Sequence, residues 1–180
     1  MATNLIVLAF LCLAFPGCNR QSDRYLLRTN DYIRREYIME IARNELGIRE
    51  ATGKNDGKRV EQYLAVTGLK AGHPWCASFI SWIFARAGYQ EPRTAWSPAL
   101  FPVRRRKKEI KPANVLGIWF PDLKRIAHAG LVEKQQGDWI ISIEGNTNMA
   151  GSREGDGVYR KRRHSKTIYA YGDWISKIAY

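Results

Sequence analysis

Hydrophobic residues in the first half of the chain recur every three or four positions, which is the spacing of amphipathic helices. The first such run extends from near Asp31 to Leu46, and Gly47 follows where a C-terminal cap is expected. The segment from Gly53 to Gly57 consists of turn-forming residues and separates this run from the next. A shorter second helix is then predicted from the apolar residues Val60, Tyr63, Leu64 and Leu69.

A third helix is predicted to begin at Cys76. Pro74 lies two residues ahead of it, and proline is favoured where a chain enters a helix. The helix should end at Gly88, because glycine is the common residue after a helix C-terminus. Its apolar positions form one continuous stripe, which a helix buries against a core: Cys76, Phe79, Ile80, Ile83, Phe84 and Ala87.

The second half of the chain has a different pattern, in which short β-branched or aromatic segments are bounded by Gly, Pro, Asn or Asp. Helices followed by consecutive strands favour an α+β fold with an antiparallel sheet over alternating βαβ units. Five strands are predicted, at residues 115–120, 128–132, 139–144, 157–160 and 173–178.

The N-terminal residues form a separate, uncharged segment. The apolar run from Leu5 to Phe15 is shorter than the about 20 residues that span a bilayer, so residues 1–18 are interpreted as a secretory signal peptide. Gly17 provides a small residue directly before Cys18, as in the signal of a bacterial lipoprotein. We therefore expect export to the periplasm, the outer membrane or the exterior, either with a lipid on Cys18 that contacts a membrane or after ordinary cleavage.

Residues 24–180 have the length of a single domain, and no internal repeat or linker divides them. The whole chain has 29 basic and 17 acidic residues, a net charge of +12 that lies entirely beyond the leader. Such an excess favours a polyanionic partner, for which bacterial cell wall and nucleic acid are the two alternatives. The densest basic clusters, 104–108 and 160–163, are also typical of a solvated face.

Cys76 is the one cysteine beyond the leader, so an internal disulfide does not explain it. A thiol at a helix start faces unpaired backbone amides and the positive end of the helix dipole, both of which favour the thiolate. Its base is predicted to be His128, which begins a strand between small neighbours that leave the ring accessible. Together they have the composition of a nucleophilic cysteine site.

A catalytic imidazole also needs a partner that fixes its tautomer. Glu144 and Asn146 lie at the end of the next predicted strand after His128, and a hairpin between the two strands would return either of them to the ring. Taken one at a time, a free cysteine is usually a small core residue and a histidine is usually structural. In this order and setting, the four residues together favour catalysis.

The cysteine helix, the histidine strand and the segment after it resemble the CHAP family of cysteine amidohydrolases and peptidases, within the NlpC/P60-like superfamily. The resemblance covers most of residues 36–163 and departs from the family's common Pro-Gly-Asp at 111–115. The motifs that carry it are Pro74-Trp75-Cys76-Ala77-Ser78-Phe79, His128-Ala129-Gly130-Leu131-Val132 and Ile143-Glu144-Gly145-Asn146-Thr147, with Gly47-Ile48-Arg49-Glu50 and Arg93-Thr94-Ala95-Trp96-Ser97-Pro98 outside them.

The resemblance implies a papain-like fold with Cys76 as nucleophile, His128 as base and Glu144 or Asn146 as third member. It implies hydrolysis of an amide bond in peptidoglycan, by an endopeptidase or an N-acetylmuramoyl-L-alanine amidase, without metal or cofactor. The Cys76 backbone amide and one more donor, for which Asn55 is a candidate, would stabilise the oxyanion.

Two tryptophans in loop-like contexts, Trp75 and Trp96, are candidates for the substrate groove. We expect a monomer that binds peptidoglycan and no nucleic acid. Two alternatives remain: a basic module that binds wall polymer or nucleic acid with an inert Cys76, and a Cys-His amidase acting on another amide. The sequence does not identify the bond that is cut.

Overall fold

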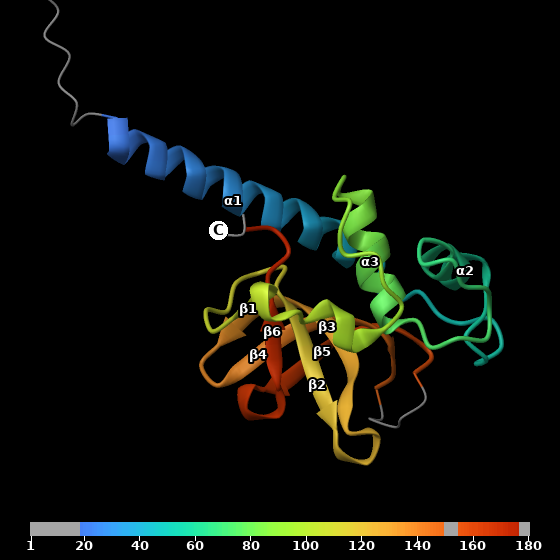
Figure 1. Cartoon of the computed structure of the whole chain (residues 1–180). Coiled ribbons are helices and arrows are strands. Elements are labelled where there is room, and N and C mark those ends of the chain that lie inside the picture. The colour runs from blue at the N-terminus through green and yellow to red at the C-terminus, as the bar shows by residue number, and fades with distance from the viewer. Residues whose placement is uncertain (1–18, 150–154, 177–180) are drawn as a thin grey trace, which may run out of the picture.

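The computed structural model describes residues 19–149 and 155–176, so the predicted signal segment and Cys18 lie outside the described residues. Its architecture is α+β, with the helices on one side of an antiparallel sheet (Figure 1). This confirms the predicted fold class. The helices are α1 (Asn19–Arg43), α2 (Lys58–Ala65) and α3 (Cys76–Arg86), with short 3-10 turns η1 (Ser97–Leu100), η2 (Val103–Arg105), η3 (Pro121–Leu123) and η4 (Ser165–Thr167).

The sheet has six strands in the order β1-β6-β2-β3-β4-β5, and every neighbouring pair is antiparallel. Its centre is a meander of long strands that follow one another in the chain. Both edge strands are basic, because β1 lies within the cluster at 104–108 and β5 contains the cluster at 160–163. The strands are β1 (Arg106–Lys107), β2 (Val115–Phe120), β3 (Arg125–Gln136), β4 (Trp139–Thr147), β5 (Gly157–His164) and β6 (Ala170–Gly172).

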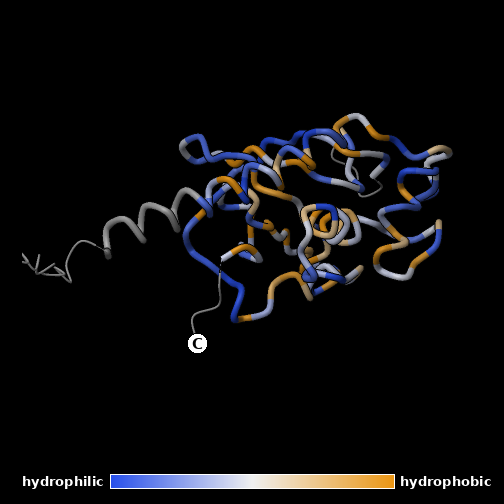
Figure 2. The backbone as a smooth tube through the Cα atoms, turned by 90° about the horizontal axis from the view of Figure 1, so that it is seen from above, coloured by the Kyte–Doolittle hydropathy of each residue, from blue (hydrophilic) through white to orange (hydrophobic). Residues whose placement is uncertain are grey.

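The main core lies between the helices and one face of the sheet. α3 supplies Phe79, Ile80 and Ile83 to it, while β3 and β4 supply Leu131 and Ile143. A smaller cluster made by Leu116, Val132 and Ile140 occupies the other face, because successive side chains of a strand point to opposite sides. Figure 2 shows the backbone from above, and hydrophilic stretches follow many of the loops at its periphery.

The predicted helices are present with shifted bounds. α3 begins at Cys76, and Gly88 follows it with the positive φ of 84° that a glycine cap provides. α1 begins twelve residues before the predicted start and ends at Arg43, after which the chain turns through Gly47. The core therefore holds α3 in the predicted position, with Cys76 at the helix end that faces the sheet edge.

The predicted strand at 173–178 is wrong in its described part. The last strand is β6, and residues 174–176 form a bend. The carboxylate of Asp173 accepts hydrogen bonds from the backbone amides of Ile175 and Ser176, which closes a turn instead of continuing the ladder. Residues 177 and 178 lie outside the described residues.

Within the described ranges, no helix combines the length and the apolar character needed to cross a bilayer.

Candidate active site

Cys76 is the first residue of α3, and its side chain is 6% exposed in the wall of a pocket. The thiol is free, and its Sγ lies 3.4 Å from the Oγ of Ser97 in η1. Because Cys76 begins the helix, its amide belongs to the first turn, whose N–H groups have no partner inside the helix. The helix therefore presents both a sulfur and an amide donor at one edge of the pocket.

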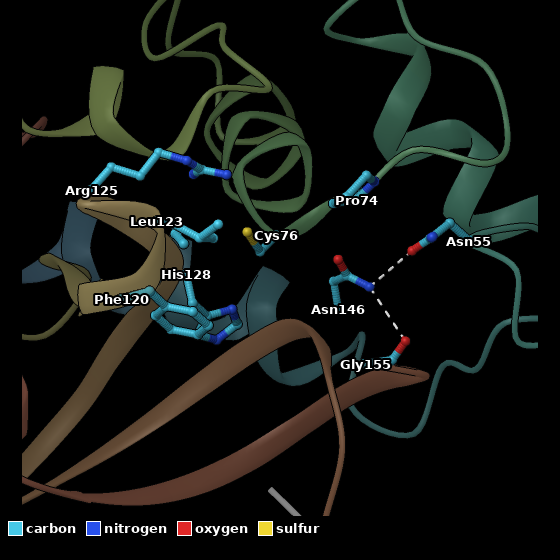
Figure 3. Close-up of a pocket in the computed structure, with 10 residues that line it drawn as sticks. Asn55, Pro74, Cys76, Phe120, Leu123, Arg125, His128, Asn146 and Gly155 are labelled. Carbon is cyan, nitrogen blue, oxygen red and sulfur yellow. Dashed lines mark hydrogen bonds between the residues drawn. The ribbon is translucent and has the colours of Figure 1, made fainter. Parts of the chain in front are cut away.

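His128 lies on β3 and brings its ring next to Cys76, as the close-up shows (Figure 3). Its Nε2 lies 2.8 Å from Oε2 of Glu144 on β4. With that nitrogen bound to the carboxylate, the ring interacts with the sulfur through charge and hydrogen bonding. The structure thus brings Cys76 and His128 together with Glu144, one of the two candidates for the third member.

Glu144 is fully buried and all of its acceptor capacity is used. Arg163 on β5 binds it with two nitrogens, Nε at 2.9 Å from Oε1 and Nη2 at 2.6 Å from Oε2. Ser142 donates its hydroxyl to Oε1 at 2.6 Å. Burial alone would raise the pKa of Glu144, but the bonds with Arg163 and His128 lower it far below its ordinary value. The carboxylate is therefore ionised and held in one orientation.

Gly130 creates the space through which Glu144 reaches the histidine. A Cβ at this position of β3 would lie 2.5 Å from Cγ of Glu144, closer than nonbonded carbon atoms come. The absence of a side chain lets the Glu144 carboxylate lie over β3 and approach His128. Gly130 is thus a structural requirement of the Glu144–His128 hydrogen bond.

The three groups shift one another's proton affinity. Burial would raise the pKa of the Cys76 thiol, but hydrogen bonding and charge from His128 outweigh burial and lower it. Burial would likewise lower the pKa of His128, whereas its hydrogen bonds with Cys76 and Glu144 raise it to about 9. At neutral pH these directions favour a thiolate paired with an imidazolium.

Asn146 lies on the opposite side of the pocket from His128 and makes its hydrogen bonds there. Its Nδ2 donates to Oδ1 of Asn55 at 3.0 Å, and its Oδ1 accepts from the backbone amide of Trp75 at 3.0 Å. Both asparagines have φ near +55°, a conformation that Asn adopts more readily than most residues. The structure therefore places Glu144, and not Asn146, against the imidazole.

The predicted groove role of Trp75 is wrong. Its side chain is fully buried, stacks on Tyr63 with 5.4 Å between ring centroids, and donates Nε1 to Glu50 at 2.8 Å. Because its backbone amide is bound by Asn146, Trp75 is fixed at both its ring and its main chain. Its position directly before Cys76 makes it a support for the start of α3.

The pocket beside the sulfur has a volume of about 330 Å³. Figure 3 shows Cys76 between two groups of residues: a neutral polar group of Asn55, Asn146 and Gly155 on one side and a group with aromatic, apolar and cationic members on the other. The second group, Phe120, Leu123 and Arg125, comes from the turn between β2 and β3. The lining residues are Asn55, Pro74, Cys76, Phe120, Leu123, Arg125, Ala127, His128, Asn146 and Gly155.

Trp96 is 54% exposed and contacts the pocket through a neighbour. The guanidinium carbon of Arg125, which lines the pocket, lies 4.3 Å from the centre of the indole ring. A direct groove role of Trp96 stays a prediction. Within residues 19–149 and 155–176, no three His, Cys, Asp or Glu side chains gather in a cluster suited to a metal ion.

The sequence pattern did not identify Ser97, Ser142 or Arg163 as site residues. Ser142 had a detectable signal, because residues two apart on a strand share a face and Ser142 precedes Glu144 by two. Arg163 had none, since it belongs to a basic run that is typical of a solvated face. Only the pairing of β5 with β4 brings its guanidinium to the buried carboxylate.

No family model and no curated protein matches the chain. Among solved structures, the fold is similar to that of the peptidoglycan hydrolase RipB from Mycobacterium tuberculosis, with a TM-score of 0.51 and 16% sequence identity. The similarity covers 83% of this chain and 69% of that one. It supports the predicted papain-like α+β fold and does not single out a CHAP domain.

Proposed function

We propose that this protein is a cysteine hydrolase that cleaves an amide bond of the peptidoglycan peptide, as an endopeptidase or an N-acetylmuramoyl-L-alanine amidase. The observation that carries the proposal is the chain of contacts from Cys76 through His128 to Glu144 beside an open pocket. The fold similarity to a peptidoglycan hydrolase supports the class of substrate. The excess of basic residues suits a wall that carries carboxylates.

In the proposed first step, the Cys76 thiolate attacks the carbonyl carbon of the scissile amide and forms a tetrahedral intermediate. The negative charge that develops on oxygen is stabilised by the Cys76 backbone amide at the start of α3. Asn55 is the proposed second donor: its Oδ1 accepts from Asn146, which leaves the amide NH2 for a ligand in the pocket.

His128 then acts as the acid. Its imidazolium donates a proton to the leaving nitrogen, the C–N bond breaks, and a thioester remains on Cys76. The neutral ring next removes a proton from water, which attacks the thioester and releases the acid product. Glu144 stays ionised throughout and stabilises the imidazolium formed in each cycle, because Arg163 and Ser142 hold its charge.

The proposed location follows from the leader. Export to the periplasm, the outer-membrane surface or the exterior would place the enzyme at its substrate, with or without a lipid on Cys18. The proposed active form is a monomer that needs no cofactor.

The proposal is tested by incubating purified sacculi with the wild-type protein and with Cys76→Ser, which replaces the sulfur with a smaller and far less nucleophilic oxygen. The wild type should release soluble fragments, whose mass spectra identify the cleaved bond. The variant should show a loss of at least about a thousandfold, since removing a catalytic nucleophile leaves only the weaker catalytic contributions. Release by folded Cys76→Ser at the wild-type rate would refute the proposal. Steeply salt-dependent polymer binding without any cleavage by the wild type would favour the binding-module alternative.

A further inference from the structure

The pocket contains one cationic side chain that the proposed mechanism does not use. Arg125 is the first residue of β3, separated from the η3 turn by Lys124 alone, and its side chain is half-buried. Figure 3 shows it on the same side of Cys76 as Leu123 and Phe120. It therefore lies where one flank of a bound substrate would lie.

Two contacts hold the guanidinium of Arg125 in place. One face packs on the Trp96 ring, with 4.3 Å from the guanidinium carbon to the ring centre, and Nη1 donates to the carbonyl oxygen of Ile126 at 3.2 Å. An arginine carries five N–H donors, so this arrangement uses only a part of them. Packing on the Trp96 indole also restricts the Arg125 side chain, so less conformational entropy of that side chain is lost when a ligand binds.

Within residues 19–149 and 155–176, Arg125 has no carboxylate partner, unlike three other buried or half-buried arginines. Arg34 and Arg105 also form no ion pair with a described residue, but neither lines this pocket. Arg35, Arg43 and Arg163 each form an ion pair with a carboxylate at 2.9 Å or less. In the described part of the chain, no carboxylate lies within ion-pair distance of Arg125, although Arg125 lines a pocket. A cation fixed in a pocket without an internal counter-charge is suited to an anionic ligand.

The two sides of the pocket differ in charge. Asn55 and Asn146 on the far side are neutral and bind each other, whereas Arg125 stands beside Phe120 and Leu123. Apolar neighbours lower the local dielectric constant and strengthen a charge-assisted hydrogen bond. The difference between the sides should set the direction in which a peptide binds.

We propose that Arg125 forms a subsite for a carboxylate of the substrate, positioned by Trp96 on the Phe120–Leu123 side of the scissile amide. This inference rests on the proposed function and names its substrate class: a wall peptide with a free acid group close to the cleaved bond. In a stem peptide, the α-carboxylate of γ-linked D-glutamate lies within one residue of both the muramoyl-alanine bond and the bond after glutamate. The planar guanidinium can bind that group with two parallel hydrogen bonds.

The test uses two synthetic substrates that differ in one group. One is a muramoyl tetrapeptide, N-acetylmuramoyl-L-Ala-γ-D-Glu-L-Lys-D-Ala with an amidated C-terminus, and the other carries a carboxamide in place of the glutamate α-carboxylate. The wild type should cleave the acid with a kcat/KM about 10 to 100 times that of the carboxamide, as expected for a charge-assisted pair. Arg125→Gln should bring this ratio close to one, mainly through KM for the acid.

Two further variants are controls. One tests whether the planar guanidinium of Arg125 is needed beyond its charge, and the other tests whether any nearby cation would serve. Arg125→Lys keeps the charge but loses the planar fork, so it should retain only part of the preference. Lys124→Asn removes a neighbouring exposed cation outside the pocket and should leave the ratio as in the wild type. Asparagine suits this position because Lys124 has a φ of 49°.

Equal losses on both substrates in Arg125→Gln would overturn the proposal, because they would place Arg125 at the reacting atoms or in the fold. A wild-type ratio near one would also overturn it. If the wild type cleaves neither substrate, binding of both to Cys76→Ala is measured by calorimetry. Tighter binding of the acid that disappears in Cys76→Ala/Arg125→Gln supports the subsite even where the proposed function fails, and equal binding of the two compounds contradicts the subsite.

Discussion

Glu144 and Asp173 are two carboxylates of the same chain that are buried in similar ways but have different partners. Glu144 is 0% exposed and Asp173 is 4% exposed, and each is bound by an arginine, Arg163 at 2.6 Å and Arg35 at 2.9 Å. Each also accepts a hydroxyl hydrogen from a serine. The difference lies in the remaining donors: Glu144 binds the imidazole of His128, whereas Asp173 binds backbone amides.

The different donors give the two buried carboxylates different roles. Backbone amides do not titrate, so Asp173 has no neighbouring acid or base whose pKa it could adjust for catalysis. Its ion pair with Arg35 connects α1 to the C-terminal segment and thereby stabilises the fold. The imidazole gains or loses a proton near physiological pH, so Glu144 changes the proton affinity of His128 and, through it, of Cys76. Glu144 thus belongs to the proposed chemistry, and Asp173 to the fold.

The largest effect should follow from Glu144→Gln. The amide cannot stabilise an imidazolium as the carboxylate does, and it can hold the ring in the wrong tautomer, so kcat on sacculi or muropeptides should fall about a hundredfold to ten-thousandfold. The pKa of His128 should fall from about 9 toward its ordinary value. Steady-state kinetics and NMR titration of the ring measure the two effects. Unchanged kcat in a folded Glu144→Gln protein would contradict the role assigned to Glu144.

Asp173→Asn should lower the free energy of unfolding by about 2 kcal/mol, because it removes one of the two carboxylates that pair with the buried guanidinium of Arg35 and leaves only Asp31. Since the segment lies outside the proposed catalytic contacts, kcat per folded molecule should stay as in the wild type. Urea denaturation and kinetics on the same preparation check both statements. A loss of kcat comparable to that of Glu144→Gln would show that the two carboxylates are not separate in role.

The stability difference between the wild type and Asp173→Asn should depend on pH in the acid range. Burial alone would raise the pKa of Asp173, but the hydrogen bond from Ser176, the charge of Arg35 and the backbone amides lower it to about 2. A depressed pKa stabilises the folded state above the unfolded value of about 4, and this contribution is lost as the pH falls through about 2. Denaturation at several pH values should therefore show the difference shrinking by about 2 kcal/mol over that range. A difference that grows toward low pH would contradict the assignment.

The smallest effect is expected for Ser142→Ala. It removes one of the donors to Glu144, while Arg163 and His128 keep the carboxylate ionised. The free energy of unfolding should fall by about 1 kcal/mol and kcat by only a few-fold. Thermal denaturation and kinetics measure it, and Ser176→Ala is the matched change at Asp173, expected to affect stability alone. A kcat loss in Ser142→Ala as large as in Glu144→Gln would assign the hydroxyl a catalytic role.

Local patterns in the sequence were sufficient for most of the fold. The apolar stripe and its glycine cap placed α3 at Cys76, and β2 occupies the predicted residues 115–120. The two-residue strand β1 was missed because its exposed Arg and Lys residues have no apolar alternation. The strand predicted at 173–178 failed because the side chain of Asp173 captures the next amides, a local competition that hydrophobicity does not report.

The candidate site was predictable only where its members lie on those elements. Cys76 and His128 were identified from their positions in a helix and a strand, but the choice between Glu144 and Asn146 needed the fold. The decisive feature is Gly130, which lets the Glu144 side chain cross β3. The burial of Trp75 was also unpredictable, because a partner for its ring nitrogen, Glu50, lies far away in the sequence.

The pairing of a Cys76 thiolate with a protonated His128 is tested most directly by the pH dependence of Cys76 alkylation with iodoacetamide. Mass spectrometry of the Cys76 peptide follows the reaction, and NMR follows the ring of His128. We predict fast alkylation well below the ordinary thiol pKa of about 8.5, with the ring titrating at about 9. Alkylation that rises only near the ordinary thiol pKa, together with a ring that titrates near 6.5, would contradict the proposed pair.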